Sequence, residues 1–489
     1  MKIKKVFKLL LIILVAFIIT GCKKNNTVDL SGFNQETKDV INDFVKLYGN
    51  KSKNYNKNTY VVSDFDNTTS IFDIAYQCSI YQLETMSFAV DANELADALA
   101  TSLEQDAVVT NYIDDIKAAY LHLIDEFGGF SPSGIEDAKL DELHNNIYWQ
   151  EFATKMKCLY TYVEDTVDDL VAYEWIMYWY TNMSEDEVYD LFKKSCTKYE
   201  NEETFEVTWT SPSSIESKIG VCSATCLLGC SVTSSVKNML KLFNENGIDV
   251  WICSASHVDG VRAAVDAFGI SEYIDGVIGM TQKLEKGKFI PEYDYVTGYP
   301  YINKGNGNWE KFDIPIKALP GRSGKVEAIT NTLVKKYGCG PLAGFMDASG
   351  DFNFCTEFAS LKMVICYNRA NRKITEGAGL VGIAAIYQKE NHIDLKKAND
   401  NNDTLYLLQG RDENGTRSLR ESNYTLRFGE KEEKLFANED NYTLFEYVKN
   451  NKLTLKQFFD TFVIFTPAKE SVINVTHGYL ESYDGYHSK

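Results

Sequence analysis

Two carboxylates follow an apolar run in the stretch Val61-Val62-Ser63-Asp64-Phe65-Asp66-Asn67-Thr68. The run predicts a buried strand, and residues i and i+2 at the end of a strand point the same way. We therefore expect Asp64 and Asp66 to look into one cleft. Two negative charges that close repel each other unless a cation lies between them or one carboxylate takes up a proton. Both arrangements suit catalysis, although an Asp-rich turn after a strand has the same composition.

The composition indicates a large, well-packed and acidic protein. A length of 489 residues suggests two to three domains, and 44% hydrophobic and 13% aromatic residues argue against disorder. The formal net charge is −19. Such a surface repels polynucleotides, so no nucleic acid is expected as a partner. An anionic substrate would need local positive charge, from a metal ion or a well-placed lysine.

Residues 1–21 predict a lipoprotein signal peptide. Lysines precede an apolar run at 9–19 that is too short for an ordinary membrane-spanning helix. Ile19-Thr20-Gly21-Cys22 follows and resembles the bacterial lipoprotein cleavage box. Cys22 would then be the lipid-modified first residue of the mature protein; the alternative is an uncleaved anchor with an incidental cysteine. In both cases we expect the protein at the cell membrane, on its extracytoplasmic face, with residues 22–58 as a tether and N-terminal helix.

The rest of the chain shows two patterns and a less regular end. Residues 71–234 carry apolar residues at three- and four-residue spacing, which predicts a helical domain. Residues 59–70 and 235–370 alternate strands with helices, which predicts an α/β fold with a doubly wound, Rossmann-like sheet. In such sheets, ligands bind beyond the carboxyl ends of the strands. Residues 371–489 are expected to pack on the sheet as a C-terminal extension.

Three further segments place reactive side chains at this sheet. Ser254 and the pair Asp347 and Asp351 follow apolar strand-like runs, and Lys325 lies at a predicted helix start. Each alone has an ordinary explanation as a strand cap, a solvated lysine or an N-cap residue. Together with the stretch at 61–68, and in this order, they resemble the haloacid dehalogenase-like (HAD) hydrolase superfamily.

The resemblance implies phosphoryl transfer through a covalent intermediate. Asp64 would attack phosphorus and carry an aspartyl-phosphate, and Asp66 would protonate the leaving oxygen and then activate water. Ser254 and Thr68 would bind phosphoryl oxygens, and Lys325 would neutralise the charge of phosphate and nucleophile. Independently of the resemblance, phosphoryl transfer requires positioning and cations that offset concentrated negative charge.

The resemblance also implies a Mg²⁺ site and a cap. Asp347 would bind the ion directly and Asp351 would support its shell, together with Asp64 and the backbone carbonyl of Asp66. Carboxylate and carbonyl oxygens suit Mg²⁺. Residues 71–234 would be the cap domain of the family. The acid at position 66 favours a phosphatase over family members that cleave carbon–halogen bonds.

Aromatic residues in the helical domain indicate a substrate. Tyr76, Trp175 and Trp179 are candidates for cation–π contacts with a quaternary ammonium group, each worth about 0.5–2 kcal/mol. The alternative is that these rings belong to the core, as aromatic residues at helical spacing usually do. Leu408-Gln409-Gly410-Arg411-Asp412-Glu413-Asn414 and the residues around the first motif resemble bacterial phosphorylcholine phosphatases. That resemblance implies a small phosphomonoester, phosphocholine, as the substrate.

Two other functions stay open at this point. One is a phosphatase for another small metabolite, such as phosphoserine, a nucleotide or a sugar phosphate. The other is a binding lipoprotein that no longer turns over substrate, against which the intact carboxylates and Lys325 argue. Among the eleven cysteines, Cys222, Cys226 and Cys230 recur every four residues. On a helix these three would share one buried face, and nearby histidines that would favour a metal site are missing.

Overall fold

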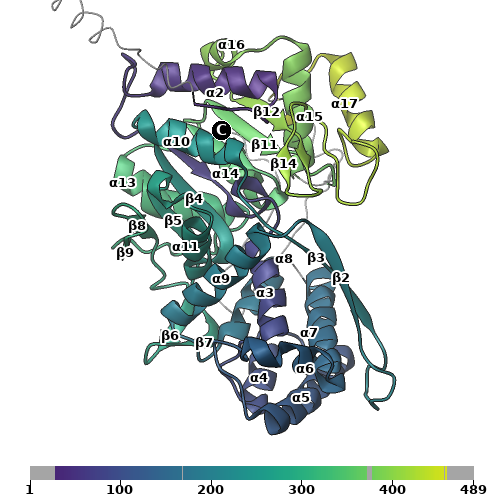
Figure 1. Cartoon of the computed structure of the whole chain (residues 1–489). Coiled ribbons are helices and arrows are strands. Elements are labelled where there is room, and N and C mark those ends of the chain that lie inside the picture. Colours follow the sequence, from purple (N-terminus) through teal and green to yellow (C-terminus); the bar gives the residue numbers. More distant parts are fainter. Residues whose placement is uncertain (1–27, 168, 372–376, 456, 460–489) are drawn as a thin grey trace, which may run out of the picture.

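The computed structural model describes residues 28–167, 169–371, 377–455 and 457–459 (Figure 1). The predicted signal peptide and Cys22 lie outside these residues. Within the described ranges, no helix is both long and apolar enough to cross a bilayer.

An eight-stranded sheet forms the centre of the molecule, in the order β12-β11-β10-β1-β4-β5-β8-β9. The six strands from β12 to β5 run parallel, and β8 and β9 add an antiparallel edge. This large, mainly parallel sheet is Rossmann-like, as the alternating pattern predicts. The bounds are β1 Tyr60–Ser63, β4 Asp249–His257, β5 Gly276–Met280, β8 Tyr301–Asn303, β9 Trp309–Lys311, β10 Ala343–Met346, β11 Met363–Tyr367 and β12 Leu405–Gln409.

Helices cover both faces of the sheet, so its parallel strands are buried on both sides, whereas the edge strands β8 and β9 are partly exposed. Alternate residues of β1 belong to two different core clusters: Val61 packs into one, and Tyr60 and Val62 pack into the other. Because both faces are buried, the strands read as continuous apolar runs rather than as alternating patterns. The first cluster includes α2 (Gln35–Tyr48), α10 (Ser234–Glu245) and α11 (Val258–Ala267); the second includes α12 (Ser323–Ile329), α14 (Phe352–Glu357), α15 (Gly377–Glu390) and α17 (Glu439–Asn451).

A second body, the helical block, follows β1 in the chain and lies below the sheet in Figure 1. The chain leaves the sheet region and returns to it at neighbouring points, because Ile71 and Ser231 exchange two backbone hydrogen bonds of 2.8 and 3.3 Å. The block consists of α3 (Ile74–Thr85), α4 (Ala92–Ala100), α5 (Ala107–Phe127), α6 (Leu140–His144), α7 (Ile147–Thr166), α8 (Asp169–Met177) and α9 (Glu185–Glu200).

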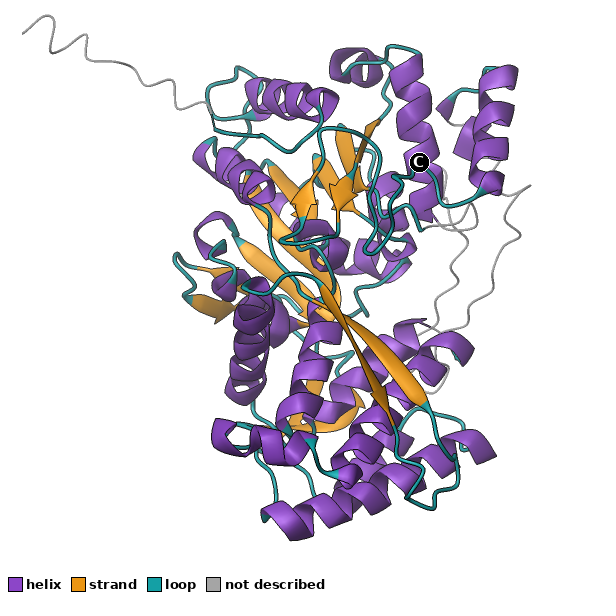
Figure 2. Ribbon diagram, turned by 45° about the vertical axis from the view of Figure 1, so that its right-hand side comes forward, coloured by secondary structure: helices purple, strands orange, loops and turns teal. Residues whose placement is uncertain are grey.

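The helical pattern does not extend to the end of this region. Residues 205–228 form an antiparallel ribbon of β2 (Phe205–Thr210) and β3 (Ser223–Leu228), which crosses the length of the block in Figure 2. Here the expectation of a helix around the cysteines is wrong, since β3 carries Cys226. Cross-strand pairs such as Thr208 with Thr225, whose hydroxyls lie 2.8 Å apart, stabilise the ribbon.

The C-terminal extension completes the sheet. Its strand β12 pairs with β11 over five residues, and all five residues of β12 are buried. After β12 the chain forms a short antiparallel pair, β13 (Arg411–Asp412) and β14 (Ser418–Leu419). This pair returns toward the carboxyl end of β1, where the functional residues gather.

Candidate active site

The carboxyl ends of four neighbouring parallel strands carry the polar residues of the site. Asp64 follows β1, which lies between β4 with Ser254 and β10 with Asp347. The backbone N–H of Asp64 still donates to Phe345 of β10, at 3.0 Å, so the nucleophile candidate is held against the central strand pair. Arg369 follows β11, the next strand beyond β10, so four segments that are far apart in the sequence converge at one edge of the sheet, where ligands bind in open α/β folds.

Three buried carboxylates form a compact oxygen cluster. Ligand oxygens of Asp64, Asp347 and Asp351 lie within 4.8 Å of one another. Their exposed fractions are 5%, 2% and 2%. Carboxylate oxygens are the ligands that hard divalent cations prefer, so this donor set fits a metal ion. The prediction that these three residues lie together agrees with this geometry.

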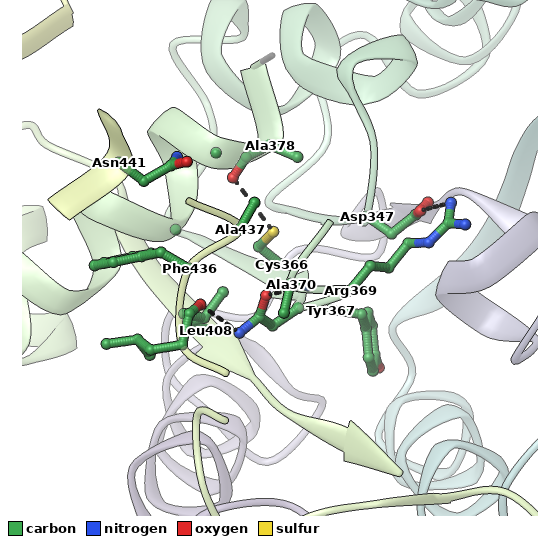
Figure 3. Close-up of a pocket in the computed structure, with 14 residues that line it drawn as sticks. Asp347, Cys366, Tyr367, Arg369, Ala370, Ala378, Leu408, Phe436, Ala437 and Asn441 are labelled. Atoms are coloured by element: carbon green, nitrogen blue, oxygen red, sulfur yellow. Dashed lines mark hydrogen bonds and ion pairs between the residues drawn. The ribbon is translucent and has the colours of Figure 1, made fainter. Parts of the chain in front are cut away.

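Two cationic side chains bind the same cluster. The Lys325 ammonium lies 2.6 Å from Asp64 Oδ1 and 2.5 Å from Asp351 Oδ1. Arg369 Nη1 lies 3.1 Å from Asp347 Oδ2, and the two side chains point toward each other in Figure 3. Thr68 donates its hydroxyl to Asp347 Oδ1 at 3.0 Å. In this structure Thr68 thus orients a candidate metal ligand, whereas the sequence analysis expected it to bind the phosphoryl group of the substrate.

The electrostatics of the cluster favour an additional cation. Burial raises the pKa of Asp64 well above its usual range, and the nearby Asp351 raises it further against the effect of Lys325. Burial likewise raises the pKa of Asp351. Although burial lowers the pKa of Lys325, the carboxylates of Asp351 and Asp64 raise it well above its usual range, so the ammonium stays charged. A bound divalent cation would allow these acids to ionise together.

Asp66 faces a different set of partners. Its carboxyl accepts hydrogen bonds from Ser256 Oγ at 2.7 Å, from Ser254 Oγ at 3.1 Å and from the backbone N–H of Ile74 at 2.7 Å. Burial and the nearby Asp73 raise the pKa of Asp66 to about 8, against these hydrogen bonds. A carboxyl group with this pKa holds a proton at neutral pH, which is what a general acid requires.

The strand β4 is irregular where it presents its serines. Its register with β5 shifts between Cys253 and His257, and irregularities of this kind re-aim side chains near active sites. Ser254, which was expected to bind a phosphoryl group, is fully buried and donates to Asp66 in this structure. Ser256 was not assigned a role from the sequence, although its i+2 spacing from Ser254 in a strand is the signal that would have found it.

Arg369 and Asp73 also lie at the site without having been assigned a role. Arg369 follows β11, so its position after an apolar strand was a usable signal. It lines a small pocket between β11, α15 and Phe436, shown in Figure 3. Asp73 caps the start of α3 by accepting from the N–H of Tyr76 at 2.9 Å, and its proximity to Asp66 is visible only in the folded chain.

The aromatic candidates of the helical block have different surroundings. Trp175 and Trp179 are 0% and 1% exposed, and their rings meet edge to face at 5.8 Å. The indole N–H of Trp175 donates to the carbonyl of Leu99 at 2.8 Å. These two residues therefore pack as core side chains, which the sequence analysis gave as the alternative to a contact with the substrate. The ring of Tyr76 is half-buried and has the ammonium of Lys157 5.0 Å from its centroid.

Comparison with known proteins supports the fold. No known protein family and no curated protein matches the chain. A conserved protein of unknown function from Anaerococcus prevotii DSM 20548 is similar in structure, with a TM-score of 0.61 and 23% identity over 81% of this chain and 98% of that chain. At this identity, the match shows a shared fold alone.

Two further solved structures are much more distant. A protein of unknown function from Bordetella pertussis Tohama I has a TM-score of 0.30 and 11% identity over 63% of this chain and 89% of that chain. Cytosolic 5'-nucleotidase IIIB bound to cytidine has a TM-score of 0.26 and 12% identity over 73% and 82%. At these TM-scores, neither structure supports a conclusion about this chain. The protein has a mixed α/β, Rossmann-like fold with a cluster of three buried aspartates beyond the carboxyl ends of its strands.

Proposed function

We propose that the protein is a metal-dependent phosphomonoester hydrolase of the HAD type. The observation that supports this most is the contact of Lys325 with both Asp64 and Asp351, within a cluster of three carboxylates that fits a divalent cation. We propose Mg²⁺ as that cation, held by Asp64, Asp347 and Asp351 together with the backbone carbonyl of Asp66. When bound, it would offset the negative charge of the phosphoryl group.

In the proposed reaction a carboxylate oxygen of Asp64 attacks phosphorus. The new O–P bond forms as the bond from phosphorus to the leaving oxygen breaks, and Asp66 gives its proton to that oxygen. Asp66 then takes a proton from water, which attacks phosphorus and releases inorganic phosphate and free Asp64. Lys325 keeps Asp64 oriented and offsets charge as it develops. These roles are supported by the contact of Asp64 with Lys325, by the hydrogen bonds of the Asp66 carboxyl with Ser254 and Ser256, and by the raised pKa of Asp66.

We propose that the helical block acts as the cap of the site and that phosphocholine is the substrate. Asp73 and Tyr76, which open α3, place the first turn of the block beside Asp66. The ring of Tyr76 has the ammonium of Lys157 5.0 Å from its centroid, so a quaternary ammonium group of the substrate would replace this cation over the ring. The acidic net charge of −19 favours a substrate with a positive substituent.

We further propose that Cys22 carries a lipid anchor and that the protein works on the extracytoplasmic face of the cell membrane. This rests on the basic, apolar and small-residue pattern of residues 1–22. Metabolic labelling with a fatty acid tests it: wild type is expected to take up label, and Cys22→Ser is expected to lose it. A labelled Cys22→Ser protein would contradict the anchor.

The activity is tested with p-nitrophenyl phosphate, with and without Mg²⁺. Wild type is expected to hydrolyse it only with a divalent cation, and Asp64→Asn is expected to reduce turnover by at least about 10³-fold. Asp125→Asn, an exposed acid on α5, is the matched control and should behave as wild type. Comparing phosphocholine with phosphoserine then tests the substrate, and equal kcat/KM values for the two would argue against a choline preference.

A further inference from the structure

The C-terminal extension reaches into the first motif through one arginine. Arg411, in β13, is 1% exposed. Its Nη1 donates to the backbone carbonyl of Asn67 at 3.0 Å, and its Nη2 donates to Asn67 Oδ1 at 3.2 Å. The two residues are 344 positions apart in the sequence. Both hydrogen bonds end on the residue directly between Asp66 and Thr68, the two loop side chains that contact the rest of the site.

The guanidinium group is itself held in place. Arg411 donates from Nε and Nη2 to Glu413 Oε1, at 3.0 and 2.6 Å. Although burial raises the pKa of Glu413, the charge and hydrogen bonds of Arg411, together with the charge of Arg369 and the N–H of Phe428, lower it overall, so the partner stays ionised. The other Glu413 oxygen accepts from the N–H of Phe428 at 3.2 Å. A buried, charge-paired and fixed guanidinium is a rigid donor rather than a mobile surface arginine.

Asn67 has a backbone conformation that needs such support. Its φ is +61°, in the left-handed region that non-glycine residues rarely adopt. This turn sends the Asp66 side chain toward Ser254 and Ser256 and the Thr68 hydroxyl toward Asp347. The loop conformation at Asn67 thus sets the direction of both the proposed acid and the side chain that orients a metal ligand.

The same segment supports a second loop of the site. The backbone N–H of Arg411 donates to Thr425 Oγ1 at 3.2 Å, and the Thr425 hydroxyl donates to the carbonyl of Asn368. Asn368 directly precedes Arg369, which pairs with Asp347. Arg411 therefore contacts the loop after β1 directly and is linked to the loop after β11 through Thr425.

We propose that Arg411 is a positioning residue for the reaction. It holds the loop between Asp64 and Thr68 in its left-handed turn and so aims the Asp66 carboxyl at the leaving oxygen. This inference rests on the proposed phosphatase activity, since it assigns Arg411 its effect through Asp66. Through Arg411, the extension then supports the first loop of the site in addition to completing the sheet.

The test compares leaving groups in Arg411→Ala and Arg411→Lys. The rate compared is that of the first step, phosphoryl transfer to Asp64 in a single turnover, because the later attack of water is common to both substrates. When the loop no longer aims Asp66, this step should be about 10²-fold slower for an alkyl phosphate. p-Nitrophenyl phosphate has a leaving group that needs little protonation, so its first-step rate should fall by only about threefold. A merely structural role, which lowers the folded fraction, would reduce both rates equally. Guanidinium ion should partly restore alkyl phosphate hydrolysis in Arg411→Ala.

Controls separate this inference from the proposed function. Arg420→Ala removes a partly exposed arginine of the same extension, which pairs with Glu433 and, at 3.9 Å, with Asp412 but not with the first loop, and it should leave both rates unchanged. Hydrogen exchange within residues 64–72 gives a readout that does not depend on activity, and it should be faster in Arg411→Ala but not in Arg420→Ala. Unchanged exchange with equal loss on both substrates would overturn the positioning role. Loss of activity in Asp64→Asn alone, with Arg411→Ala like wild type, would overturn it while the phosphatase assignment stands.

Discussion

At the residue scale, the surroundings of each acidic side chain separate its role from that of its neighbours. Asp64 and Asp66 are two residues apart, yet Asp64 faces Lys325 and Asp66 faces Ser254 and Ser256. One carboxyl is therefore beside a fixed positive charge, and the other is bound by neutral donors and has a pKa of about 8. With a divalent cation bound beside Lys325, Asp64 would ionise and could act as nucleophile, whereas Asp66, which accepts from neutral donors, keeps its proton and is suited to act as acid.

The metal-site assignment predicts a dependence of stability on Mg²⁺. Saturating Mg²⁺ should stabilise wild type by about 3 kcal/mol, since an ion that binds only the folded state at 100 times its Kd has this effect. Asp347→Asn should remove most of the stabilisation, because it converts a central ligand to a neutral amide. Thermal unfolding monitored by circular dichroism measures both. A full Mg²⁺ shift in Asp347→Asn would contradict the assignment of Asp347 as a ligand.

The two buried tryptophans should behave as core residues. Trp175→Ala and Trp179→Ala are each expected to lower the free energy of unfolding by roughly 3–5 kcal/mol, the usual cost of truncating a large buried ring. The ratio of kcat/KM for phosphocholine to that for phosphoserine, measured on folded protein, should stay that of wild type. If either substitution abolished a choline preference without loss of stability, the packing role would be wrong.

At the scale of elements, the sheet strands were predictable and the ribbons were not. Strands such as β1 and β10 are short apolar runs that end at Asp64 and Asp347, and this change from apolar to acidic is visible in a local window. The β2–β3 ribbon has little apolar burial, with only Trp209 of β2 buried, and its stability comes from pairing between strands 13 or more residues apart. The spacing of apolar residues within one short segment carries no information about the distant segment that pairs with it.

The contact between β4 and the start of β5 predicts a pH dependence of stability. Burial and the nearby Asp249 raise the pKa of Asp275 to about 7, while its carboxylate accepts from the N–H of Val250 at 2.7 Å. Because the folded-state pKa lies above the unfolded value, the stabilising contribution is present at low pH and is lost as pH rises through about 7.

Asp275→Asn keeps the acceptor for Val250 and removes the titration. The free energy of unfolding of Asp275→Asn minus that of wild type should therefore be roughly 2 kcal/mol larger at pH 8 than at pH 5. Urea unfolding at the two pH values measures this difference. Asp394→Asn is unsuitable as a control because it caps α16 (Leu395–Asp400), whereas exposed Asp125→Asn should show no such trend. A pH-independent difference between Asp275→Asn and wild type would contradict the assignment.

At the scale of the whole molecule, the site is a meeting point of segments from most of the chain. The residues at 64–68, 254–256, 325 and 347–351 were predictable because each stands next to its own strand or helix. The place of Arg369 at the site could have been predicted by the same reasoning, because it follows strand β11. Arg411 lies in the stretch 408–414 that the sequence analysis singled out, but nothing near position 411 indicates its contact with Asn67, which is 344 positions away. Contacts that join distant segments depend on the complete topology.

The central claim is that Asp64 accepts a phosphoryl group at this meeting point. Acid quenching of the enzyme during turnover of ³²P-labelled substrate tests it most directly. The label is expected on the peptide that contains Asp64, should be released by hydroxylamine as an acyl phosphate, and should be absent from Asp64→Asn. Equal labelling of Asp64→Asn, or turnover that survives this substitution, would contradict the account.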